Sequence, residues 1–142
     1  MNLLQHNLKY HTDSTKLFER LSHKPWAILL DSGQPQSQYG RYDIIVADPF
    51  IMVCTIENDM GMRTEVTQLG QVNVSSKDPF DILNTLMAPY KAAQTDLPFS
   101  GGAVGYFAYD LARQIETLPN LSLPNQSIPH MMVGIYDWAV VV

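Results

Sequence analysis

The sequence has few of the features that mark secreted, membrane-bound or nucleic-acid-binding proteins. Its 142 residues include a single cysteine, Cys54, so no internal disulfide can form. No apolar run approaches the roughly 20 residues that cross a bilayer, and the first residues lack the basic and apolar segments of a signal peptide. Nine Lys and Arg against 14 Asp and Glu give a net charge of −5, which disfavours nucleic acid as a partner. The sequence therefore predicts a cytoplasmic protein.

Signatures of catalysis are also sparse. The four histidines are scattered without metal-ligand spacing, and one cysteine cannot complete a zinc site. Ser32 lacks the glycines of a serine-hydrolase elbow. The glycine-rich stretch 99–105 lacks the lysine of a phosphate loop and runs into a segment that favours a strand. Glycines in a strand mark a bulge or a close approach by another backbone or a ligand. No catalytic residue and no metal ligand is predicted among these residues.

Hydrophobic residues make up 46% of the chain, which predicts one globular domain over residues 1–142. Short apolar or alternating runs bounded by turn residues predict strands. We expect strands over 26–31, 42–47, 50–56, 62–68, 71–74 and 130–142, with an additional edge strand within 1–11.

Two helices are predicted from capping residues and apolar spacing. The first runs from about Ser14 to Ser22 after an Asp13 cap, and the second begins at Asp78 and closes near Pro89. A helical turn or two over 111–116 and an irregular loop over 118–129 follow. Because helices do not alternate regularly with strands, the predicted fold class is α+β, with mostly antiparallel sheets and two main helices.

A polar loop lies between the predicted strands 26–31 and 42–47. Ser32, Tyr39 and Arg41 stand where the two strands would present them together. A small-molecule site needs a few polar groups at the ends of rigid elements, and this loop provides them. An ordinary connection between neighbouring strands has the same composition, so the pattern alone leaves both interpretations open.

The sequence finishes on the apolar run 138–142 without a polar tail. Natural termini are usually polar and frayed. We therefore expect that the chain was cut within or just after a strand, and that it is the N-terminal piece of a longer protein.

Several stretches together resemble the component I chains of aminodeoxychorismate synthase, also called para-aminobenzoate synthase. They are Arg20–His23, Pro25–Gly33, Tyr39–Ile44, Leu97–Tyr106, Tyr109–Leu111 and Gly134–Ala139. The resemblance covers nearly the whole chain from about Ser14 onward, and the pieces occur in the right order. Component I of anthranilate synthase belongs to the same superfamily.

The resemblance implies that the full-length enzyme aminates chorismate to 4-amino-4-deoxychorismate on the route to folate. A glutaminase partner would deliver ammonia, and Mg²⁺ would hold the chorismate carboxylate. The implied fold is part of an α/β sandwich. Because the family's catalytic residues and magnesium ligands belong to a C-terminal half outside residues 1–142, this piece is expected to have no cofactor and no activity of its own.

The resemblance also implies a tryptophan pocket, formed in this chain by Ser32, Tyr39, Gly40, Arg41 and Tyr42. Tryptophan is a feedback inhibitor in the anthranilate branch and can be a buried structural ligand in the aminodeoxychorismate branch. Family members often have Ser where Gly40 stands and Phe where Tyr42 stands.

Two alternatives stay open. The chain could be the regulatory N-terminal part of anthranilate synthase component I, or a non-catalytic amino-acid-binding module. The amino-acid sequence of Pro25–Gly33 favours the aminodeoxychorismate branch.

Overall fold

The computed structural model describes residues 3–33, 38, 40–58, 61–90, 95–114, 116 and 128–142. The contacts gather in two compact units, one of Met1–Pro49, Tyr90–Gly102 and Ile135–Val142, the other of Phe50–Pro89 and Ala103–Gly134. The first unit holds a three-stranded sheet, and the second holds most of a five-stranded sheet. Two α-helices and these antiparallel sheets confirm the predicted α+β class. The single domain over 1–142 stays a prediction.

The sheet of the first unit has the order β1-β2-β8. Its strands are β1 (Ile28–Leu30), β2 (Ile44–Val46) and β8 (Val140–Val141). The central strand β2 pairs antiparallel with both neighbours, and its Ile45 and Val46 are fully buried. Three consecutive β-branched residues suit this strand, because they pack well on a pleated surface.

Helix α1 (Ser14–Glu19) precedes β1. The Asp13 carboxylate caps it, as predicted, by accepting a hydrogen bond from the Thr15 N–H at 3.1 Å. The helix is shorter than the expected range, which extended to Ser22. Residues 20–24 continue instead in hydrogen-bonded turns.

The strand predicted over 26–31 begins two residues later than expected, at Ile28. Trp26 has φ of +52°, a left-handed backbone conformation that cannot continue an extended strand. The buried Tyr136 hydroxyl donates a hydrogen bond to the Trp26 carbonyl oxygen at 2.8 Å. Burial raises the pKa of Tyr136 to about 12, so the hydroxyl remains a donor at any physiological pH. This hydrogen bond between residues distant in sequence therefore keeps Trp26 out of the strand.

Asp48, which follows β2, also has a left-handed backbone conformation, with φ of +51°. Its N–H donates to the Pro25 carbonyl oxygen at 2.9 Å, and its carboxylate forms an ion pair with Lys24. The two left-handed residues thus belong to one bonded corner of the first unit.

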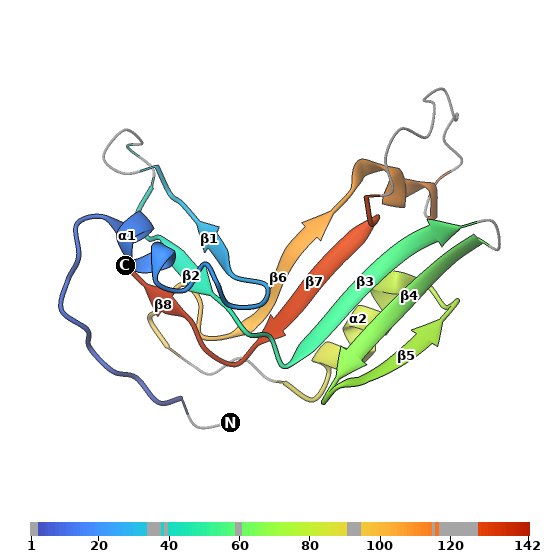
Figure 1. Cartoon of the computed structure of the whole chain (residues 1–142), viewed down its shortest axis with the longest axis horizontal. Helices are drawn as coiled ribbons and strands as arrows, with labels where there is room; N and C mark the ends of the chain where they lie inside the picture. Colours follow the sequence, from blue (N-terminus) through green and yellow to red (C-terminus); the bar gives the residue numbers. More distant parts are fainter. Residues whose placement is uncertain are drawn as a thin grey trace. The chain divides into compact units, whose positions relative to one another are not determined.

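The sheet of the second unit has the order β5-β4-β3-β7-β6 (Figure 1). Its strands are β3 (Ile51–Asn58), β4 (Gly61–Gln68), β5 (Gln71–Ser75), β6 (Gly102–Phe107) and β7 (Met131–Tyr136). Two successive antiparallel hairpins join the first three strands, as the turn residues predicted.

The core of this sheet includes one buried polar pair. Thr55 and Thr64 lie opposite each other on β3 and β4, and their hydroxyl oxygens are 2.8 Å apart. One hydroxyl donates to the other, so both have a hydrogen-bond partner, which offsets the cost of burying them. Strand β7 has neighbours on both edges and is almost wholly buried, which agrees with its nearly continuous apolar sequence.

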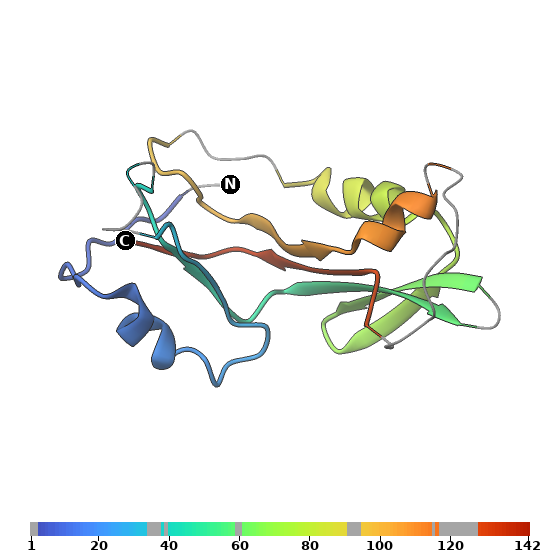
Figure 2. The same cartoon turned by 90° about the horizontal axis from the view of Figure 1, so that it is seen from above.

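Helix α2 (Pro79–Met87) lies against one face of the five-stranded sheet (Figure 2). The Asp78 carboxylate caps it by accepting bonds from the N–H groups of Phe80 and Asp81. The Phe80 ring stacks on Phe107 with centroids 5.6 Å apart, which fixes the helix to β6. After β6, a 3-10 helix, η1 (Tyr109–Gln114), occupies the place of the predicted helical turns.

The glycine-rich stretch forms a strand, as predicted, and not a phosphate loop. A Cβ atom on Gly105 would overlap the carbonyl oxygen of Met132 on the neighbouring strand β7. Close approach by another backbone, one of the predicted reasons for glycine here, is therefore confirmed.

Two predicted strands are wrong. Residues 3–11 form no strand. The strand expected over 130–142 is two strands, because β7 ends at Tyr136 and β8, which begins at Val140, belongs to the other sheet. Most of the loop predicted over 118–129 lies outside the described residues. Among the described helices, none is long and apolar enough to cross a membrane.

We predict that Tyr136→Phe lowers the free energy of unfolding by about 1–3 kcal/mol, because the Trp26 carbonyl loses its hydrogen-bond donor. Urea unfolding monitored by tryptophan fluorescence measures the loss. Tyr106→Phe is the matched control, since its half-exposed hydroxyl donates to the Pro129 carbonyl oxygen at 3.1 Å. Equal losses for both variants would contradict the importance assigned to the buried hydroxyl.

Candidate functional site

The predicted ligand loop connects β1 to β2, and the structure describes residues 31–33, 38 and 40–43 of it. Ser32 is half-buried, and its N–H donates a hydrogen bond to Asp43 Oδ1 at 2.8 Å. This hydrogen bond joins two residues that are eleven positions apart in sequence, and it closes the base of the loop.

Gly40 lies directly against Ser32. A Cβ atom at position 40 would overlap the Ser32 carbonyl oxygen, so the backbones of these two residues touch. The hydrogen side chain of glycine is what permits this contact. A serine at position 40 would require the loop to move.

The other predicted ligand residues are placed differently. The side chains of Arg41 and Tyr42 are exposed, Tyr42 to 45%. Tyr39 lies outside the described residues. The structure thus brings together Ser32 and Gly40, and leaves Arg41 and Tyr42 at the surface of the same loop.

Asp43 is the residue of this site that sequence reasoning did not single out. Its Oδ2 accepts a hydrogen bond from the Ser14 hydroxyl of α1 at 2.5 Å. Hydrogen bonds from Ser14 and then from Ser32 hold the pKa of the Asp43 carboxyl below its ordinary value of 3.8. Asp43 and Val142 also exchange two backbone hydrogen bonds, of 3.0 and 2.9 Å. No local sequence signal points to these partners, because Ser14 and Val142 are distant in the chain.

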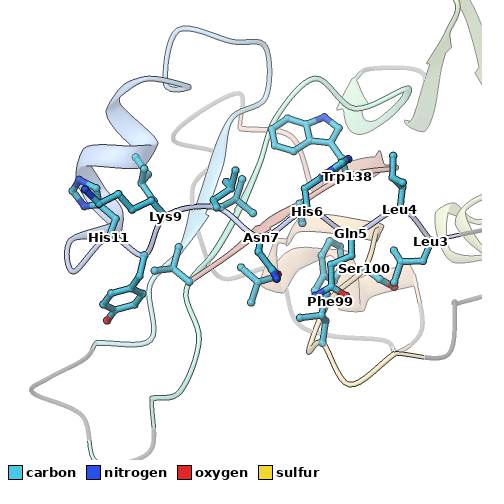
Figure 3. Close-up of a pocket in the computed structure, with 18 of the residues that line it drawn as sticks. Leu3, Leu4, Gln5, His6, Asn7, Lys9, His11, Phe99, Ser100 and Trp138 are labelled. Carbon is cyan, nitrogen blue, oxygen red and sulfur yellow. The ribbon is translucent and has the colours of Figure 1, made fainter.

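A groove of about 420 Å³ lies elsewhere in the first unit (Figure 3). It is lined by residues 3–11, Leu17, Leu97, Phe99, Ser100 and 137–142. The described members of the predicted ligand set, Ser32, Gly40, Arg41 and Tyr42, are not among its lining residues. His11 is one of the lining residues, and its Nδ1 atom is buried without a hydrogen-bond partner among the described residues. Sequence reasoning did not identify this groove, which residues distant in the chain enclose.

Within the described part of the chain, no three His, Cys, Asp or Glu side chains gather closely enough to hold a metal ion. The Asp43 carboxylate accepts its hydrogen bonds from the Ser14 hydroxyl and the Ser32 N–H.

No protein-family model matches the chain. Aminodeoxychorismate synthase component 1 of Escherichia coli (strain K12) is 42% identical over 128 residues, which are 88% of this chain and 27% of that protein. The chain belongs to this component 1 family. The protein of the same name from Salmonella typhimurium is 38% identical over 128 residues, which are again 88% of this chain and 27% of that protein.

Anthranilate synthases also match the chain. Anthranilate synthase component 1 of Acetivibrio thermocellus is 35% identical over 85% of this chain and 26% of its own length. The chain thus spans about a quarter of the length of the curated component 1 proteins that it matches. The resemblance read from the sequence is confirmed.

We predict that Asp43→Asn destabilises the chain by about 1–2 kcal/mol at pH 7, because an amide can accept only one of the two bonds from Ser14 and Ser32. Since the folded pKa of Asp43 is lowered, its stabilisation is present above pH 3.8 and is lost as the pH falls through the folded pKa. The difference between parent and variant should therefore shrink between about pH 5 and pH 2.

Urea unfolding at a series of pH values measures this difference. Asp31→Asn is the control, because the exposed Asp31 carboxylate accepts a local hydrogen bond from the Gly33 N–H. A loss at pH 7 as large for Asp31→Asn, or a difference for Asp43→Asn that persists unchanged at pH 2, would refute the assignment.

Proposed function

We propose that this chain is the N-terminal part of the component I subunit that aminates chorismate to 4-amino-4-deoxychorismate in folate biosynthesis. The observation that carries this proposal is the 42% identity, over 88% of the chain, to a protein named aminodeoxychorismate synthase component 1. Three matched proteins of that name are 38–42% identical to the chain, and anthranilate synthase component 1 of Acetivibrio thermocellus is 35% identical. This order favours amination at the 4-position over anthranilate formation.

In this proposal the chemistry resides in the remainder of the full-length protein. A glutaminase partner supplies ammonia, and Mg²⁺ binds the carboxylate of chorismate there. The absence of an acidic cluster among the described residues supports placing the metal outside them. Residues 1–142 contribute structure and a ligand loop, and are inactive alone.

We further propose that the loop 31–43 binds tryptophan or a similar amino acid through Ser32, Tyr39, Gly40, Arg41 and Tyr42. An amino acid needs a negative partner for its ammonium group and a positive or N–H partner for its carboxylate. The Asp43 carboxylate beside Ser32 supplies the first. The exposed Arg41 guanidinium supplies the second.

The activity is tested with a polypeptide of family length, incubated with chorismate, ammonia and Mg²⁺. We expect 4-amino-4-deoxychorismate from that protein and no product from the 142-residue chain. Chromatography with mass spectrometry identifies the product. Anthranilate instead would support the second enzymatic assignment, and no product from the longer protein would refute the enzyme proposal.

The ligand is tested by calorimetric titration of tryptophan into parent and variant chains. We expect Ser32→Ala to bind about tenfold more weakly, the equivalent of one lost hydrogen bond, while the Ser32 N–H still donates to Asp43. Ser22→Ala is the matched control, since the exposed Ser22 hydroxyl donates to the Glu19 carbonyl oxygen in the turns after α1. A Ser32→Ala chain that binds as tightly as the parent would count against this site.

A further inference from the structure

Strand β5 forms one end of the five-stranded sheet (Figure 1). Among the described residues β4 is its single neighbour, so the other side of β5 pairs with no described strand. Sheet edges are usually protected against pairing by charged side chains, proline or a bulge. The sequence of β5, Gln-Val-Asn-Val-Ser, has no charge and no proline, and its register with β4 is continuous over all five residues. This edge is therefore suited to pairing with a further strand.

The turn before β5 determines which backbone groups of the strand face the open side. Residues 69 and 70 form a two-residue hairpin turn, and both have positive φ, of +51° and +76°. A hydrogen-bonded pair closes such a turn, so Gln71 bonds to β4. Hydrogen-bonded and non-hydrogen-bonded pairs alternate along an antiparallel ladder, so Asn73 bonds to β4 as well. The N–H and C=O groups of Val72 and Val74 consequently point away from β4.

The side chains of the same two valines are exposed, Val72 to 57% and Val74 to 54%. Residues that pair across strands share a face of the sheet, so Val74 lies on the same face as Cys54 of β3. Cys54 is half-buried, whereas Val53, on the opposite face, is fully buried. The edge thus combines outward backbone groups with two β-branched side chains on the more exposed face, and both features favour strand pairing.

The sequence of β5 is symmetric in character about Asn73. A valine lies on each side of it, and the polar residues Gln71 and Ser75 follow outward. When a second copy of β5 pairs antiparallel about a two-fold axis at Asn73, Val72 of each strand lies opposite Val74 of the other. Because these two residues carry the outward backbone groups, the pairing forms four backbone hydrogen bonds. The strand is therefore complementary to itself.

Charge also favours a copy of the same chain at this edge. The chain has a net charge of −5, so two copies repel unless they meet at an uncharged surface. Residues 69–76 contain no charged side chain. Glu65 on β4 would lie at least three strand spacings, about 14 Å, from its counterpart, which exceeds the screening length of roughly 8 Å at physiological salt.

We propose that β5 pairs with β5 of a second copy of this chain, in register about Asn73, so that two sheets join into one. This inference goes beyond the reaction proposed above and does not depend on it. Failure of the longer polypeptide to aminate chorismate would leave the self-association described below unchanged.

Opposite charges at position 73 test both the pairing and its register. In the proposed dimer the two Asn73 side chains face each other as a non-hydrogen-bonded pair. Asn73→Asp and Asn73→Lys should each weaken self-association of the polypeptide of family length about fivefold at low salt, because like charges then lie opposite each other. An equimolar mixture of the two variants should restore association at least to that of the parent. Sedimentation over a concentration series measures each dissociation constant.

Asn84, an exposed residue of α2, is the matched control position. Aspartate or lysine at position 84 should leave the dissociation constant unchanged. A parent that stays monomeric up to about 1 mM would overturn the proposal. Equal effects at positions 73 and 84, or a mixture of the Asn73 variants that fails to restore association, would also overturn it.

Amide hydrogen exchange identifies the occupant of the edge. We expect the Val72 and Val74 amides to be protected where the dimer forms and to exchange faster on dilution, while the Asn73 amide, bonded to β4, stays protected at both concentrations. Valine protection that persists in the dilute monomer would assign the edge to another segment of the same polypeptide and refute the proposal. Fast exchange of both valines in the dimer would place the contact elsewhere and refute it as well.

Discussion

The first unit depends on the bonds that converge on Asp43. Its carboxylate accepts hydrogen bonds from the Ser14 hydroxyl and the Ser32 N–H, and its backbone pairs with Val142. One residue thus fastens α1, the loop after β1 and the strand β8 to β2. Hydrogen bonds to a charged acceptor are stronger than those between neutral groups, and the lowered pKa of Asp43 reports that these bonds favour the charged form. Short strands of two and three residues need such a connection, because their ladders alone contain few bonds.

Local patterns predicted most elements of the fold, because those elements are stabilised by neighbours in sequence. Asp13 and Asp78 cap their helices through bonds that reach only two or three residues along the chain. The hairpins β3–β4 and β4–β5 follow from alternation and turn residues. The failures have distant causes. Trp26 leaves the strand because Tyr136, 110 residues away, bonds its carbonyl oxygen. The break after Tyr136 separates strands of two sheets, and an unbroken apolar run cannot reveal such a division.

The candidate site was predictable only in part, for a similar reason. The composition of the loop pointed to Ser32 and the resemblance added Gly40, and the structure places their backbones in contact. Asp43 stands in the same stretch of sequence as one carboxylate among many, and only its partners distinguish it. The edge strand expected within 1–11 was predicted from leucines among polar residues, but a strand needs a paired neighbour. The described residues give this segment none, so it forms no strand.

The loop and the groove share one structural element. The backbone of Asp43 sets the register of β8 and so directs Val141 outward, while its carboxylate holds Ser32 at the loop. A ligand that draws the Ser32 N–H away would remove one of the two bonds that the carboxylate accepts, on the residue that positions β8.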